Sequence, residues 1–134
     1  MLHKLQNIGF IEVGKWQMEN DYFTHTIVEY LNEKKILYSF VSENNVLYIG
    51  KTTNFLKSRM NGYKNPHSTQ KTNYRVKAKI IDLLSSGKEV CIFILIDKTV
   101  FNFGGYTLCL ASGLEDTLIA DLNPKWNDRG VLKI

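Results

Sequence analysis

The chain has 134 residues, of which 44% are hydrophobic and 22% are charged, a composition typical of one globular domain. Its longest apolar run, Val90–Ile96, is far shorter than the roughly 20 residues needed to span a bilayer, and its N-terminus lacks the apolar segment of a signal peptide. Two cysteines, Cys91 and Cys109, do not fit a metal site built on cysteine, and we expect a cytoplasmic protein without membrane contact.

The positive charge is concentrated in one part of the sequence. The whole chain has a net charge of +4, yet eight basic residues and no acidic residue lie between Asn44 and Lys79. The rest of the chain then has nine basic residues against thirteen acidic ones. A concentrated patch of cations attracts polyanions more strongly than the net charge suggests. The distribution favours nucleic-acid binding, with a solvated basic face as the alternative.

The first part of the chain predicts a short strand and a helix. Residues 10–13 precede Gly14 and indicate a short strand or arm. Asp21 is a candidate N-cap, because apolar residues follow it at helical spacing. These residues are Phe23, Ile27, Tyr30 and Leu31.

Two apolar runs joined by a polar turn predict a β-hairpin in the next segment. The runs are Leu37–Val41 and Val46–Ile49, and the turn between them contains two asparagines. Each arm carries a tyrosine, Tyr38 in the first and Tyr48 in the second, and Lys51 follows the second arm. The hairpin therefore places two phenols and a cation close together.

The rest of the chain predicts three helices, a buried strand and a second hairpin. The strand at residues 90–96 is apolar on both faces, which is typical of a strand covered on two sides. The other elements are expected as a helix at 55–61 capped by Asn54, a polar loop at 63–73, and helices at 74–86 and 113–122, with a hairpin or an extended excursion at 100–110 folded at Gly104 and Gly105. This order predicts a small α/β (α+β) sandwich with a mixed sheet of three or more strands flanked by helices.

The first hairpin also resembles that of the GIY-YIG nuclease family. Tyr48-Ile49-Gly50 is a YIG, and Ile36-Leu37-Tyr38 stands ten residues earlier, where the family has its GIY. That family continues with an arginine on the next helix, a glutamate on a later helix and an asparagine near the end. This chain has Arg59, Glu115 and Asn127 in that order.

The resemblance implies a metal-dependent DNA endonuclease with a role in restriction, repair or a mobile element. It implies a GIY-YIG-like nuclease core at residues 35–134 with a hairpin insertion at residues 98–110, and an N-terminal extension at residues 1–34 packed on the core. Lys51 and Tyr63 stand where relatives place functional side chains. The implied metal ligand is Glu115, and the implied catalytic residues are Tyr38, Tyr48, Lys51, Arg59, Tyr63 and Asn127.

Phosphodiester hydrolysis gives a reason for these residue types. A tyrosine with a pKa of about 10 is a poor base at neutral pH, but Lys51 and Arg59 would favour the phenolate of Tyr38 or Tyr48. Arg59 also has the forked geometry that grips two phosphoryl oxygens. Glu115 with waters and substrate oxygens is a normal arrangement for Mg²⁺, or Mn²⁺ in its place, and such an ion acts as a Lewis acid on the scissile phosphate.

Each assignment has a structural alternative. The two hairpin tyrosines could be ordinary strand aromatics. Ser112 and Glu115 match a capping box, in which the glutamate bonds back to the start of a helix. Asp116 and Asp121 match the metal pattern less well. The three histidines have no metal-ligand spacing.

DNA is the expected partner, and the basic stretch is its expected binding face. Because no recognition module is visible, specificity is expected from loops, from residues 1–34, from a homodimer or from a partner protein. The alternative function is a catalytically inactive nucleic-acid-binding module that uses the same basic groove. The expected DNA-binding residues are Lys57, Lys64, Lys71, Arg75 and Lys77.

Overall fold

A computed structural model describes residues 1–127, so the end of the predicted core, residues 128–134, lies outside the described residues. Within residues 1–127, five strands form one sheet in the order β2-β1-β5-β3-β4. The strands are β1 (Ile11–Glu19), β2 (Tyr22–His25), β3 (Ile36–Ser42), β4 (Asn45–Thr52) and β5 (Val90–Leu95).

The α+β class is confirmed, and the buried strand predicted at residues 90–96 is the middle strand of this sheet. The expectation of a mixed sheet is wrong, because every pairing among the five strands is antiparallel. The physical reason is that β5 enters between β1 and β3 in the direction opposite to both. The helices between β4 and β5 therefore do not form the crossover that a parallel pair requires.

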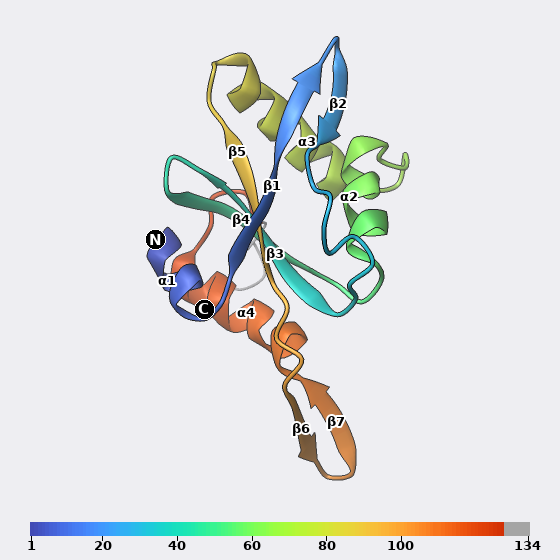
Figure 1. The fold of residues 1–134 in the computed structure, drawn as a ribbon, viewed down its shortest axis with the longest axis vertical. Coiled ribbons are helices and arrows are strands. Elements are labelled where there is room, and N and C mark those ends of the chain that lie inside the picture. Colours follow the sequence, from blue (N-terminus) through green and yellow to red (C-terminus); the bar gives the residue numbers. More distant parts are fainter. Residues whose placement is uncertain (128–134) are drawn as a thin grey trace.

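Helices cover both faces of the sheet (Figure 1). Tyr38 and Phe40 of β3 pack with the helices on one face, whereas Leu37 and Val41 pack with those on the other. Alternate residues of one strand therefore enter different clusters, and all seven residues of β3 are buried. No helix within residues 1–127 is long and apolar enough to cross a membrane. The helices on the first face are α2 (Leu56–Lys64) and α3 (Lys71–Ser85), and those on the second are α1 (Leu2–Asn7) and α4 (Leu110–Leu122).

The prediction of a helix after Asp21 is wrong, because residues 22–25 form β2, which pairs with β1. Asn20 and Asp21 form the connecting turn with φ angles of 51° and 65°, the left-handed conformation that two-residue hairpin turns favour. Phe23 stacks on Trp16 of β1, with ring centroids 4.6 Å apart. Phe23, which the apolar spacing assigned to a helix face, therefore makes a contact between two strands of the sheet.

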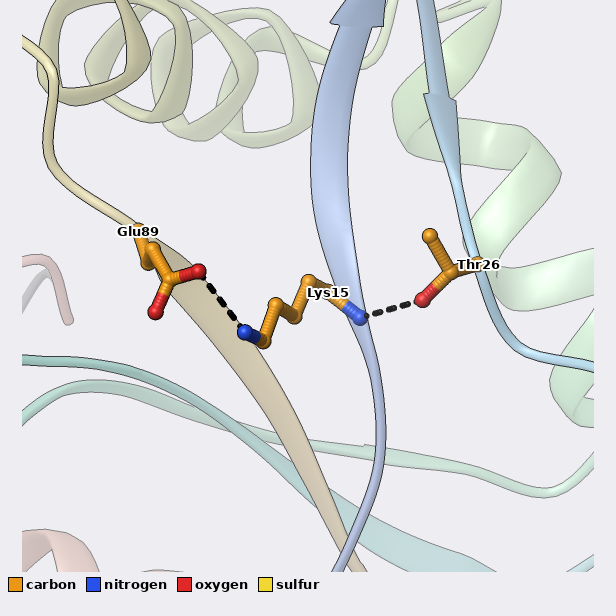
Figure 2. Close-up of polar contacts among 3 residues, drawn as sticks. All are labelled: Lys15, Thr26 and Glu89. Atoms are coloured by element: carbon orange, nitrogen blue, oxygen red, sulfur yellow. Dashed lines mark hydrogen bonds and ion pairs between the residues drawn. The ribbon is translucent and has the colours of Figure 1, made fainter.

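The segment after β2 is held against β1 (Figure 2). The Lys15 backbone N–H donates to Thr26 Oγ1 at 2.9 Å, and the Lys15 ammonium forms an ion pair with Glu89 at 2.7 Å, just before β5. Gly14 permits the close approach, since a Cβ at that position would lie 2.8 Å from Ile27 Cγ1. The first two strands are thus part of the same sheet as the tyrosine hairpin.

The predicted helices exist, but their bounds differ. α2 continues past the glycine at position 62 as far as residue 64, because Tyr63 is fully buried in the core. α3 begins at Lys71 rather than at residue 74, which shortens the predicted loop. α4 begins at Leu110 rather than at residue 113, directly after the second hairpin.

That second hairpin is confirmed as β6 (Val100–Phe103) and β7 (Tyr106–Cys109), which form a separate two-stranded sheet. Gly104 and Gly105 make its turn with φ angles of 58° and 85°. We call this element the β6–β7 ribbon. It projects away from the body of the molecule beside one end of α4 (Figure 1).

Candidate active site

Tyr38 and Tyr48 lie on the face of the sheet that α2 and α3 cover. They are diagonal neighbours on β3 and β4, with ring centroids 6.3 Å apart. Tyr38 is fully buried and lies directly opposite Gly50, the glycine of the YIG. A Cβ at position 50 would lie 2.5 Å from Tyr38 Oη, so the glycine leaves room for the phenol. The predicted hairpin is confirmed, and its glycine has a packing reason.

Arg59 and Tyr63 of α2 meet the hydroxyl of Tyr38. Arg59 Nε donates a hydrogen bond to Tyr38 Oη at 2.7 Å, and Arg59 Nη2 donates to Tyr63 Oη at 3.0 Å. The two hydroxyls lie 2.7 Å apart, and either can donate to the other. Arg59 and Tyr63 share one face of α2 because they are four residues apart. The structure thus brings three of the predicted site residues into one hydrogen-bonded cluster.

Asn73 of α3 completes the contacts of the guanidinium and was missed in the sequence. Arg59 Nη1 donates to Asn73 Oδ1 at 3.3 Å, and Asn73 Nδ2 donates to the carbonyl of Gly62 at 3.3 Å. Asn73 is only 3% exposed. Its spacing from Val76 and Ile80, three and seven residues later, places it on the buried face of α3. That spacing is the available signal in the sequence, and the polar composition of residues 63–73 masks it.

Burial further favours the protonated form of the two inner phenols. Burial raises the pKa of Tyr38 well above the ordinary tyrosine value, and the nearby charge of Arg59 offsets only part of this effect. Burial also raises the pKa of Tyr63. Both phenols are therefore protonated at neutral pH. For Tyr38, burial therefore opposes the phenolate that the charge of Arg59 favours, and Tyr48 is the other candidate base on the hairpin.

Glu115 of α4 lies beside Lys51 at the end of β4. Lys51 Nζ is 3.9 Å from Glu115 Oε1, and the glutamate side chain is 19% exposed. Burial raises the pKa of Glu115, whereas the positive charges of Lys51 and Arg59 act to lower it. Because α4 begins at Leu110, Ser112 lies inside the helix, and the capping-box alternative for Glu115 is wrong. The carboxylate is therefore free of a capping role.

A divalent metal at this site would be held by one carboxylate rather than by a cluster of protein ligands. Within residues 1–127, no group of three or more His, Cys, Asp or Glu side chains is gathered as a metal cluster. Mg²⁺, however, is commonly bound by one or two carboxylates together with waters and phosphate oxygens. Glu115 fits that arrangement because it is a half-buried carboxylate within the electrostatic influence of Arg59. Asp116, its neighbour in sequence, is exposed.

Asn127 has a different environment from the arginine cluster. Its Nδ2 donates to the carbonyl of Ile49 at 2.8 Å, and its Oδ1 accepts from the Ile49 N–H at 3.0 Å. The neighbouring Trp126 N–H donates to the carbonyl of Leu47 at 2.8 Å. These contacts run along the outer edge of β4 on both sides of Tyr48. Asn127 therefore acts on the strand that carries Tyr48, and its amide is used by the backbone.

The predicted DNA-binding cations differ in their availability. Lys57 and Lys71 are exposed. Arg75 donates to the carbonyl of Trp126 at 2.7 Å, and Lys77 donates to the carbonyl of Lys64 at 2.9 Å. Lys64 and Lys57 also line a hollow of about 420 Å³ beside α2. Arg75 and Lys77 thus have structural contacts of their own, whereas Lys57 and Lys71 present their charges to solvent.

No protein-family model and no curated protein sequence matches this chain, but solved structures do. A glutamate-to-alanine mutant of bacteriophage T4 EndoII matches with a TM-score of 0.75 at 20% identity, over 96% of this chain and 98% of that chain. Restriction endonuclease HPY188I in complex with product DNA matches with a TM-score of 0.57 at 15% identity, over 98% of this chain and 84% of that chain. This chain has a nuclease fold.

The match to a nuclease fold is what the resemblance to the GIY-YIG family predicted. Because the identities are low, the likeness concerns the path of the backbone over nearly the whole chain. The roles of single side chains follow from the geometry of this molecule instead. The strongest feature of that geometry is the partly buried guanidinium of Arg59 between Tyr38, Tyr63 and Asn73.

Proposed function

We propose that this chain is an endonuclease that hydrolyses phosphodiester bonds in DNA. One observation carries the proposal: Arg59 is held on three sides by Tyr38, Tyr63 and Asn73, on a backbone that shares the fold of two endonucleases. The half-buried carboxylate of Glu115 lies within the electrostatic influence of this guanidinium. Electrostatic catalysis requires preorganised groups of this kind.

Arg59 is the group that would bind the phosphoryl oxygens. A guanidinium has five N–H donors, and three of them are used by Tyr38, Tyr63 and Asn73. Two N–H donors remain, one on Nη1 and one on Nη2, and a pair of this kind can bind two phosphoryl oxygens. The three contacts fix the direction of the fork, so charge that develops on the phosphate meets donors already in place.

The phenols have different roles in this proposal. Tyr38 and Tyr63, which stay protonated, hold the guanidinium and keep water away from its inner side. Tyr48 is the candidate general base for the attacking water, because it lies beside Tyr38 on the neighbouring strand. Asn127 is a positioning residue, since it fixes the backbone of Ile49 next to Tyr48.

Glu115 would hold a divalent cation, Mg²⁺ or Mn²⁺, and when bound the ion would supply Lewis-acid stabilisation of the scissile phosphate. Lys51, which is exposed and lies 3.9 Å from Glu115, would neutralise negative charge at the mouth of the site. Lys57 and Lys71 would bind flanking phosphates in any sequence. Lys64, Arg75 and Lys77 add positive potential along the same surface.

Plasmid cleavage tests the proposal against the alternative of an inactive DNA-binding module. The purified protein should nick or linearise supercoiled plasmid in the presence of Mg²⁺ and not in the presence of a chelator. Glu115→Gln should remove cleavage while leaving DNA binding intact, because the amide lacks the anionic oxygen that Mg²⁺ prefers. Asp116→Asn is the matched control, since it removes the same charge at the exposed neighbour and should remain active. A protein that binds DNA but never cuts it would instead be a binding module.

A further inference from the structure

The β6–β7 ribbon has one apolar face that no other part of residues 1–127 covers. Residues directly opposite each other in a hairpin share a face, and the register pairs Phe101 with Leu108 and Phe103 with Tyr106. All four side chains therefore lie on one side. Their exposed fractions are 53%, 54%, 78% and 75%, respectively. The other face is more polar, and there Thr107 donates to Asn102 at 3.2 Å.

This arrangement is unfavourable for an isolated chain in water. A two-stranded hairpin alone is marginally stable and normally needs a covering layer. The base of the ribbon is anchored, because the Leu110 N–H donates to the carbonyl of Thr99 at 2.9 Å and Lys98 forms an ion pair with Glu33 at 3.0 Å. Its tip makes no such contact with the described residues. Contiguous apolar surface of this kind marks an interaction site.

The absence of charged residues on the ribbon argues against DNA as the partner that binds this face. No charged residue lies between Thr99 and Leu114, so the ribbon offers no cation to phosphate. Half or more of the hydrogen bonds in protein–DNA complexes go to phosphate and sugar. The cations suited to DNA lie instead on α2 and α3, whereas the ribbon follows β5 and leads into α4.

The size of the face suits a second copy of this chain. Aromatic side chains bury about 150–250 Å² each, so at these exposures the four side chains leave about 500 Å² of apolar surface. Two copies facing each other would bury about 1,000 Å² in total, the lower bound for a specific interface. An uncharged, apolar patch is also complementary to itself, as a two-fold symmetric contact requires.

We propose that the β6–β7 ribbon is a homodimerisation surface, in which the face formed by Phe101, Phe103, Tyr106 and Leu108 packs against the same face of a second copy. Because the buried area is near the lower bound, the dimer should form at micromolar concentration. The interface does not depend on nuclease activity, and its test needs no DNA. Since α4 begins where the ribbon ends, association would also place a partner near the helix that carries Glu115.

Sedimentation velocity over a range of micromolar concentrations tests the proposal. The parent protein should shift from 15.5 kDa to twice that mass as its concentration rises. Replacing all four residues of the face with threonine, which keeps β propensity, should leave a monomer at every concentration. Val100→Thr is the matched control, because Val100 is 55% exposed on the opposite face of the same ribbon, and this variant should still dimerise.

A single substitution at the tip of the ribbon provides a second test in case the fourfold variant fails to fold. Phe103→Lys places a like charge on both copies across the two-fold axis, and Phe103 is 78% exposed, so folding should be unaffected. The dimer dissociation constant should rise at least tenfold, with an unchanged melting temperature. A parent that is monomeric throughout would overturn the proposal. A dimer that persists in both variants would also overturn it. So would a monomeric parent whose DNA binding is weakened by the ribbon substitutions, because the face would then contact DNA.

Discussion

Replacing Gly50 with alanine tests the packing of the YIG glycine against Tyr38. The added Cβ would lie 2.5 Å from Cζ and Oη of Tyr38, whereas unbonded carbon atoms prefer about 3.5–4.0 Å. The ring is fully buried, and its hydroxyl is held at 2.7 Å by both Arg59 and Tyr63. It therefore cannot turn aside without breaking the cluster. We expect the free energy of unfolding to fall by about 1–3 kcal/mol, the usual cost of overpacking a core.

Urea denaturation followed by circular dichroism measures this change. Gly113→Ala is the matched control, because Gly113 lies within α4 and nothing is within 4 Å of an added Cβ. That variant should be more stable than the parent by about 0.5–1 kcal/mol, since alanine is the better helix former. If Gly50→Ala were as stable as the parent, the close approach of Tyr38 would not explain why position 50 is a glycine.

A double-mutant cycle separates this clash from other effects at position 50. In a Tyr38→Ala background, where the ring is absent, Gly50→Ala should cost clearly less than it does in the parent. An equal cost in both backgrounds would place the strain elsewhere. The same variants link packing to the proposed chemistry. Because Tyr38 holds Arg59 Nε, Gly50→Ala should also lower the rate of DNA cleavage.

Three further predictions concern the site and its surroundings. Arg59→Lys should lower the single-turnover cleavage rate by about a hundredfold, about 2.7 kcal/mol, because the charge stays but the forked guanidinium is lost. A near-normal rate would show that cleavage does not need the guanidinium fork. Asn127→Ala should lower the free energy of unfolding in urea by about 1–3 kcal/mol, since both backbone groups of Ile49 lose a partner, and an unchanged value would contradict that role. The combined substitutions Lys57→Glu and Lys71→Glu should reduce the magnitude of the slope of log affinity against log salt by about 2, measured by fluorescence anisotropy with labelled DNA. An unchanged slope would show that DNA binds elsewhere.

Elements with a strong local signal could be predicted from the sequence. The tyrosine hairpin was predicted because two apolar runs flank a turn with asparagines, and Glu43 and Asn44 adopt the positive φ angles that such turns need. The ribbon was predicted from Gly104 and Gly105 for the same reason. The strand at residues 90–96 was predicted because its two apolar faces require cover on both sides.

Elements whose signal depends on distant residues were mispredicted or missed. The segment at residues 22–25 matched a helical period, and only its stacking on Trp16 shows that it is a strand. Glu115 matched a capping box, but the helix starts earlier, because β7 leads directly into it. The burial of Asn73 could not be predicted, since its partner Arg59 lies fourteen residues earlier on another helix.

The sequence by itself determined which residues could form the site, because the order of Tyr38, Tyr48, Arg59 and Glu115 and the local patterns around them are properties of the chain. Only the tertiary structure decided what each can do. Burial raises the pKa of Tyr38 despite the charge of Arg59, and the edge of β4 takes up the amide of Asn127. Desolvation and hydrogen bonding depend on every atom that surrounds a group, and those atoms come from segments far apart in the sequence.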